Sequence, residues 1–124
     1  MTLILLVEDN EMLQDIVSAR LELRGYDVDV VSHGGEALTY LEAKHPDVIL
    51  MDMSLPYMNG WDATERIKAN EVTKHIPVIA LTAHALSSDR RRSFEVGCDE
   101  YETKPIKFDR LVGKIDRLVN GAGF

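Results

Sequence analysis

The chain alternates short aliphatic runs with longer segments of helical periodicity, and this alternation restricts the fold more than any other feature. The short runs have the length and composition of strands, over residues 3–7, 27–31, 47–51, 76–81 and 99–102. Segments of helical spacing follow them, over 10–24, 34–44, 60–69, 87–96 and 107–119. Repeated strand–helix pairs predict an open α/β sheet of parallel strands joined by right-handed crossovers.

The pattern inside each segment indicates how it is buried. Residues 3–7 are apolar on both faces, as in a buried parallel strand, whereas 27–31 alternate and indicate a sheet edge. In the first helix the predicted core face carries Met12, Ile16, Ala19 and Leu23, widened by Leu13, Val17 and Leu21. Gly25 follows at the place of a C-capping glycine.

Size and charge narrow the class of protein. A chain of 124 residues corresponds to a single domain, over 1–124 with a short tail at 120–124. The net charge of −7 argues against binding to nucleic acid or to an anionic membrane. No apolar stretch reaches the length that spans a bilayer, and the lone Cys98 fits a reducing compartment, so we expect a cytoplasmic protein.

Reactive side chains follow four of the five predicted strands. Glu8 and Asp9 come after the first, Asp52 after the third, Thr82 after the fourth and Lys104 after the fifth. In an open α/β sheet the ligand site lies beyond the carboxyl ends of the strands, where the strand order reverses. We therefore expect three carboxylates, a hydroxyl and an ammonium to converge at one edge.

Such a cluster has a definite chemistry. Three neighbouring carboxylates repel one another unless a cation neutralises them, and Mg²⁺ prefers oxygen ligands of this kind. Aspartate can act as a nucleophile and form an aspartyl phosphate. The constellation predicts Mg²⁺-assisted transfer of a phosphoryl group onto a carboxylate, stabilised mainly by charge.

Four motifs resemble the receiver domain of two-component response regulators, in that family's order and spacing and over essentially the whole chain. They are LLVEDN (5–10), LMDMSLPYMNG (50–60), IPVIALTAHA (76–85) and GCDEYETKPI (97–106). The resemblance, to the chemotaxis-regulator-like type that consists of one domain, implies a flavodoxin-like, doubly wound sheet of five parallel strands in the order 2-1-3-4-5 with five helices.

The resemblance also assigns roles at the acidic cluster. Asp52 would accept the phosphoryl group. Asp9 would bind Mg²⁺ directly, Glu8 mostly through water, and Ser54 through its backbone carbonyl. Glu8 stands where many relatives have Asp, which leaves only its coordination in doubt.

Further roles follow from the same resemblance. Thr82 would move onto the phosphoryl group and Lys104 would bind it, with a cis bond between Lys104 and Pro105. Tyr101 would be the aromatic switch residue, and the small Ala83 would leave access to the acceptor. Ser54 and His84 occupy the two variable positions associated with the lifetime of the phosphoryl group.

By this resemblance the chain is a signalling protein and not an enzyme. It would take its phosphoryl group from a histidine kinase or a histidine phosphotransfer protein and contact a downstream protein, as a monomer or a phosphorylation-dependent dimer. The start MTLILLVEDN favours a stand-alone receiver. The alternative is a receiver module excised from a hybrid kinase or a longer regulator.

Other classes fit the residues less well. A phosphatase of the haloacid dehalogenase type needs a second Asp two residues after its nucleophile, where this chain has Ser54. A flavodoxin-like electron carrier needs a phosphate-binding loop after the first strand, and Glu8 and Asp9 would repel phosphate. A degenerate receiver that only binds partners would not need the intact acidic set with Lys104.

Overall fold

The computed structural model describes residues 2–55, 57–83 and 87–120. In this part of the chain five parallel strands form one sheet in the order β2-β1-β3-β4-β5. The strands are β1 (Leu3–Val7), β2 (Asp27–Val31), β3 (Val48–Asp52), β4 (Val78–Thr82) and β5 (Glu100–Thr103). The predicted order 2-1-3-4-5 and the edge position of residues 27–31 are confirmed.

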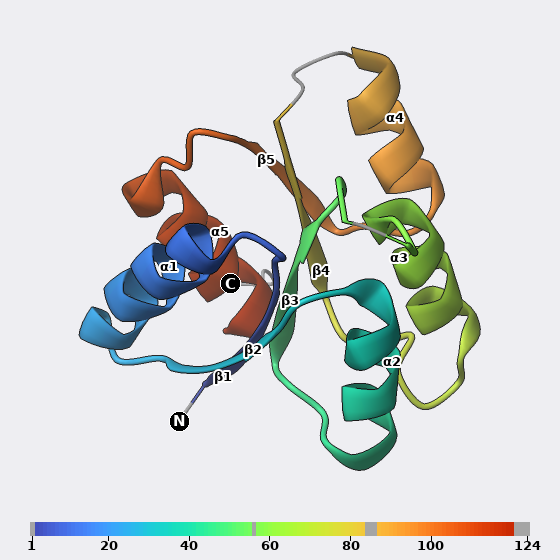
Figure 1. Ribbon diagram of the computed structural model, residues 1–124, viewed down its shortest axis with the longest axis horizontal. Helices are drawn as coiled ribbons and strands as arrows, with labels where there is room; N and C mark the ends of the chain where they lie inside the picture. The colour runs from blue at the N-terminus through green and yellow to red at the C-terminus, as the bar shows by residue number, and fades with distance from the viewer. Residues whose placement is uncertain (1, 56, 84–86, 121–124) are drawn as a thin grey trace.

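Helices cover both faces of the sheet. They are α1 (Glu11–Leu23), α2 (Gly34–Ala43), α3 (Gly60–Ala69), α4 (Ser87–Glu95) and α5 (Phe108–Val119). Figure 1 shows α1 and α5 on one face and α2, α3 and α4 on the other. This is the doubly wound, flavodoxin-like α/β fold that the sequence predicts.

Three strands, β3, β4 and β5, end one residue later than their sequence pattern predicts. Asp52 and Thr82 are the last residues of β3 and β4 and do not follow them. The ladder continues because Asp52 pairs with Leu81, and the Met53 N–H donates to the Leu81 carbonyl at 2.9 Å. The later start of β4, at Val78, has a simple cause, since Pro77 has no N–H to donate.

The apolar face predicted for α1 is wrong in part. Val17 and Leu21 are buried, but the Met12 side chain is 71% exposed and Leu23 is 87% exposed, with Ile16 also exposed. Apolar residues recur at helical spacing in two neighbouring rows, and α1 turns only one of them to the sheet. Periodicity cannot choose between two such rows, because both satisfy it.

Helix α1 ends as the sequence predicts, at a glycine. Gly25 has φ +93°, in the left-handed region that glycine reaches without steric cost. Its N–H donates to the Glu22 carbonyl at 3.0 Å, and the Tyr26 N–H donates to Leu21 at 3.2 Å. This pair of bonds is the Schellman motif, which satisfies the last carbonyls of the helix and directs the chain into β2.

The core consists of two clusters, one on each face of the sheet. One cluster packs α2 and α3 against the sheet and includes Cys98, whose burial raises the pKa of its thiol to about 12. The other packs α1 and α5 against the opposite face. β1, β3 and β4 contribute alternate side chains to both, so the middle of the sheet is rigidly held and fixes the residues at its carboxyl edge.

In the described ranges we find no helix with the length and apolar character that crossing a membrane requires.

Candidate functional site

The site lies where β1 and β3 end side by side. β1 is the strand at which the order reverses, with β2 on one side and β3 on the other. Val7 pairs with Met51, so the next residues, Glu8 and Asp52, lie side by side at the carboxyl edge of the sheet. Register therefore brings together two carboxylates that are 44 positions apart in sequence.

Three carboxylates form one cluster at this edge. Glu8, Asp9 and Asp52 each offer an oxygen, and these oxygens all lie within 4.8 Å of one another. Glu8 and Asp52 are each 2% exposed, while Asp9 is exposed and faces solvent. Because all the donors are oxygens and one side is open, the cluster fits a hard divalent cation such as Mg²⁺.

Lys104, at the end of β5, neutralises the two buried carboxylates. Its Nζ lies 3.0 Å from Glu8 Oε1 and 3.2 Å from Asp52 Oδ2. Burial raises the pKa of Glu8, although the hydrogen bond from Lys104 favours the ionised form and acts in the opposite direction. Burial alone would lower the pKa of Lys104, but its bonds and charges with Glu8 and Asp52 raise it instead. The bond from Lys104 to Pro105 is cis, as the resemblance implies.

Replacing Lys104 with methionine should destabilise the metal-free protein by about 3 kcal/mol, because two buried carboxylates lose their counter-ion. Urea unfolding at neutral pH with a chelator present measures this loss. Lys107, three residues on and exposed, provides the matched control, and Lys107→Met should change stability by less than about 0.5 kcal/mol. Equal effects of the two substitutions would contradict the role of the buried ion pairs.

Two backbone N–H groups fix the direction of the carboxylates, and a side chain of α1 holds the backbone at Glu8. The Ser54 N–H donates to Asp52 Oδ1 at 2.9 Å, and the Asn10 N–H donates to Glu8 Oε2 at 3.1 Å. The Gln14 side-chain amide, on α1, donates to the Glu8 carbonyl. Gln14 could not be predicted from the sequence, because a glutamine in the second turn of a helix has no distinctive pattern.

Gly60 is a second residue that sequence reasoning missed. A Cβ built at Gly60 would lie 2.4 Å from the Asp52 carbonyl oxygen and 2.7 Å from Met53 Cα. The start of α3 therefore packs directly on the backbone of the candidate acceptor. A glycine at the first position of a predicted helix, eight residues after the acceptor, is the signal that could have indicated it.

The predicted switch residues are adjacent in space. Thr82 is buried at the end of β4, and its carbonyl accepts from the Lys104 N–H at 2.7 Å. Tyr101 is half-buried against the core. Burial and Asp89 raise the pKa of the Tyr101 phenol, and a hydrogen bond with Thr82 opposes the shift. Ala83 is exposed next to Thr82, and His84 lies outside the described residues.

Next to Tyr101, β5 carries a buried acid. Glu102 is 1% exposed and accepts hydrogen bonds from Arg110 and Lys114 of α5, the latter at 2.9 Å. Lys114 also donates to the Tyr101 carbonyl. Burial would raise the pKa of Glu102, but the two cations outweigh it and hold the pKa below its ordinary value. These bonds tie β5 to α5.

The stabilisation that Glu102 provides should depend on pH. A carboxyl group whose pKa is lowered by folding contributes its stability above its ordinary pKa of 4.5 and loses it as the pH falls through the folded value. Glu102→Gln should therefore cost about 2 kcal/mol at pH 7 and progressively less below pH 4.5. Urea titrations of both proteins measure this, with the exposed Glu65→Gln as control. A difference that stays constant or grows in acid would contradict it.

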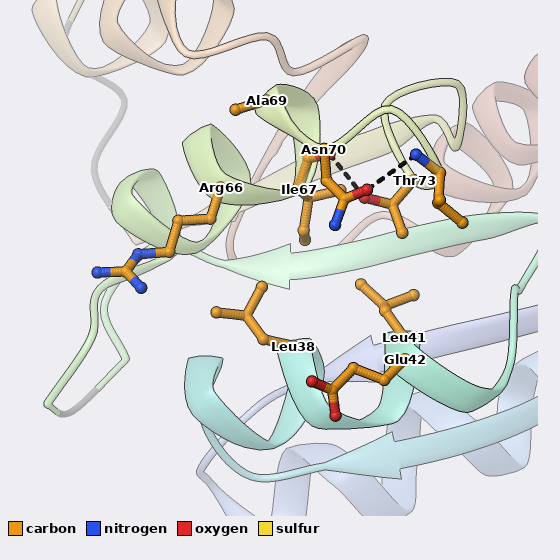
Figure 2. Close-up of a pocket in the computed structure, with 9 residues that line it drawn as sticks. Leu38, Leu41, Glu42, Arg66, Ile67, Ala69, Asn70 and Thr73 are labelled. Atoms are coloured by element: carbon orange, nitrogen blue, oxygen red, sulfur yellow. Dashed lines mark hydrogen bonds between the residues drawn. The ribbon is translucent and has the colours of Figure 1, made fainter.

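A hollow of about 600 Å³ lies between α2 and α3, away from the carboxylates. Figure 2 shows its aliphatic walls, Leu38 and Leu41 from α2 and Ile67 from α3. The polar groups beneath are already bonded, since Asn70 Oδ1 accepts from the Val72 N–H and Thr73 Oγ1 donates to the Ile67 carbonyl. Glu42 and Arg66 also line the hollow, but the described residues there form no carboxylate cluster like that of Glu8, Asp9 and Asp52.

Comparison with known proteins agrees with this geometry. A family model described as the response regulator receiver domain matches residues 4–116. The polar-differentiation response regulator DivK of Brucella ovis is 38% identical over 119 residues, which cover 96% of this chain and 97% of DivK.

Solved structures of similar proteins have the same fold. The receiver domain of the sensor histidine kinase PA1611 from Pseudomonas aeruginosa PAO1 is 39% identical with a TM-score of 0.90, over 97% of this chain and 98% of that domain. That structure has a magnesium ion coordinated in its active-site cleft. The chemotaxis response regulator CheY4 of Vibrio cholerae is 26% identical with a TM-score of 0.89, over 95% and 98% of the two chains. From the family match, the end-to-end similarity to DivK and the acidic edge of the sheet, it follows that the chain belongs to the family of response regulator receiver domains of two-component signalling.

Proposed function

We propose that this receiver takes a phosphoryl group onto Asp52 and passes the signal on by protein–protein contact. The observation that carries the proposal is the setting of the Asp52 carboxylate, with Lys104 Nζ 3.2 Å away and oxygens of Glu8 and Asp9 within 4.8 Å. Mg²⁺ would be held by Glu8, Asp9, Asp52 and the Ser54 carbonyl. The magnesium-bound PA1611 domain, which is similar over nearly its whole length, supports this assignment.

Phosphoryl transfer needs a nucleophile and charge stabilisation. A carboxylate oxygen of Asp52 forms the new bond to phosphorus while the bond from phosphorus to the donor nitrogen of a phosphohistidine breaks, and its electron pair stays on the donor. Lys104 stabilises the negative charge on the transferred oxygens. Bound Mg²⁺ would supply further stabilisation of that charge. The exposed Ala83 leaves space beside the acceptor.

The signal would leave through the surface formed by α4, β5 and α5. Phosphorylation adds close to two negative charges at Asp52, which would draw the Thr82 hydroxyl toward the phosphoryl group. Tyr101 already contacts Thr82, so its side chain would follow. Lys114, bonded to the Tyr101 carbonyl and to Glu102, would transmit the change to α5.

The donor would be a histidine kinase or a histidine phosphotransfer protein. A groove of about 480 Å³ beside Lys104 supports a protein donor, because its lining is mostly apolar. Its residues come from α1, from the loop between β5 and α5, and from the start of α5: Leu13, Ile16, Val17, Lys104, Pro105, Ile106 and Phe108. The exposed Met12 extends the apolar surface at one end of α1.

We infer a stand-alone receiver, residues 1–124, because DivK is matched over 97% of its own length. It would act in the cytoplasm, as a monomer or a phosphorylation-dependent dimer, without binding nucleic acid or membrane. The similarity to the receiver domain of a sensor histidine kinase supports the alternative, in which the chain is a receiver module of a hybrid kinase or of a longer regulator.

Incubation with acetyl phosphate, followed by intact mass measurement, tests the proposal. With Mg²⁺ present we expect the mass to rise by one phosphoryl group, and with excess EDTA we expect little uptake. Hydroxylamine should remove the group, since an acyl phosphate reacts with it and a serine or threonine phosphate does not. No uptake, or a modification that survives hydroxylamine, would overturn the proposal.

A further inference from the structure

The packing of α4 is unusual for a surface helix. In its span of residues 87–95 a single side chain is buried, and it is the serine Ser93, which is 0% exposed. By contrast, α5 buries Leu111, Val112 and Ile115. A buried leucine or isoleucine stabilises a helix by about 1.5–3 kcal/mol, and α4 has none. Phe94 is 40% exposed, so the buried attachment of this span rests largely on polar contacts.

Two polar contacts of α4 meet at one side chain of α3, which lies beside it on the same face of the sheet (Figure 1). The Trp61 Nε1–H donates to Ser93 Oγ at 3.2 Å, and Ser93 Oγ donates to the Asp89 carbonyl at 3.0 Å. The Arg92 guanidinium lies over the Trp61 ring, 4.3 Å from its centroid. Two consecutive residues of α4 therefore hold the same indole.

Trp61 is in turn fixed to the end of β3. It follows Gly60, which contacts the backbone of Asp52 and Met53 so closely that no Cβ fits, and the Gly60 N–H donates to the Met53 carbonyl at 3.2 Å. Trp61 also packs against the core cluster on this face of the sheet. A shift of the backbone at the acceptor is therefore passed to the indole without a flexible segment between them.

From these contacts we propose that Trp61 is a positioning residue that sets the orientation of α4 and couples it to the acceptor end of β3. This coupling is additional to the one through Thr82 and Tyr101. The anchoring of α4 is independent of phosphorylation, whereas the coupling rests on the proposed function of Asp52.

Limited trypsin digestion measures the anchoring directly, because α4 carries Arg90, Arg91 and Arg92. When opening is fast relative to cleavage, the rate follows the population of the open helix. Trp61→Phe keeps an aromatic ring but removes the N–H donor, and Ser93→Ala removes its acceptor. Each should speed cleavage in α4 about fivefold. The double variant should be no faster than Ser93→Ala, since all three lose the Trp61–Ser93 hydrogen bond and Ser93→Ala also loses the bond to the Asp89 carbonyl.

Two controls separate this effect from general loosening. Cleavage at Arg110 and Arg117 in α5 should not change. Ser18→Ala in α1 removes a hydroxyl that, like that of Ser93, donates to the carbonyl four residues before it, so it should leave cleavage in α4 unchanged. Unchanged cleavage of α4 in Trp61→Phe and Ser93→Ala, or effects of the two that add in full, would overturn the anchoring.

The coupling is tested on the same proteins after acetyl phosphate and Mg²⁺, with uptake verified by intact mass. Phosphorylation should change the rate of cleavage in α4 severalfold in the parent and less than twofold in Trp61→Phe. Because Trp61 is the sole tryptophan, its fluorescence should also change on phosphorylation in the parent, and less in Ser93→Ala. Full responses in the phosphorylated variants would overturn the coupling. Absence of uptake by the parent would instead count against the function of Asp52, and the unmodified proteins would still decide the anchoring.

Discussion

Asp52→Asn should abolish phosphoryl uptake from acetyl phosphate, to below about 1% of the parent's, because an amide oxygen is not a competent nucleophile for forming the aspartyl phosphate. The fold should survive this change. The amide oxygen of the substituted side chain can still accept from the Ser54 N–H, and Lys104 keeps its 3.0 Å bond to Glu8. Intact mass after incubation measures uptake, and a urea titration of the same sample verifies that the variant is folded.

Asp9→Asn is the informative comparison for this variant. It removes an exposed member of the acidic cluster but keeps the nucleophile. We therefore expect slow uptake that recovers in part at high Mg²⁺ concentration, in contrast to the complete loss in Asp52→Asn. Phosphorylation that persists in Asp52→Asn would place the acceptor on another residue.

Gly60→Ala should destabilise the protein strongly, by about 3 kcal/mol. The new methyl group would lie 2.4 Å from the Asp52 carbonyl oxygen and 2.7 Å from Met53 Cα. Both are backbone atoms at the end of a buried central strand, so neither can move aside as a flexible side chain would. The urea midpoint measures the loss, and uptake of phosphoryl groups should also fall because Asp52 is displaced.

Gly113→Ala is the matched control, since it makes the same change inside α5. Nothing lies within 4 Å of a Cβ at Gly113, so no contact is disturbed. Alanine favours a helix interior over glycine by about 1 kcal/mol, and we expect a gain in stability of that size. The two identical substitutions should therefore change stability in opposite directions. If both variants were destabilised to a similar extent, the loss of stability in Gly60→Ala would not come from a clash with the backbone of Asp52 and Met53.

Much of the fold could be predicted because each element has its own local signal. The aliphatic runs indicated the strands to within two residues, and the edge position of residues 27–31 followed from their alternation. Strand ends could be read in the same way, which is why the cluster at Glu8, Asp9 and Asp52 could be predicted without its geometry. In parallel sheets the carboxyl ends of the strands share one edge, so sequence order alone brings these residues together.

Local signals failed where two arrangements satisfy the same pattern. The apolar row of α1 that includes Met12 and Leu23 has the same spacing as the row with Val17 and Leu21, and only packing against the sheet selected the second. No pattern in the sequence relates Trp61 to Ser93, which lies 32 residues later. Contacts of this kind depend on where two helices lie on a sheet.

By itself the sequence determined the alternation of strands and helices, the family, and the residues that gather at the carboxyl edge, because these follow from local periodicity and chain order. Only the tertiary structure decided which carboxylates Lys104 neutralises, that Gly60 contacts the backbone of Asp52, and that α4 is held by Trp61. Those facts depend on distances between elements that are remote in sequence, set by strand register and helix packing, and no local pattern records them.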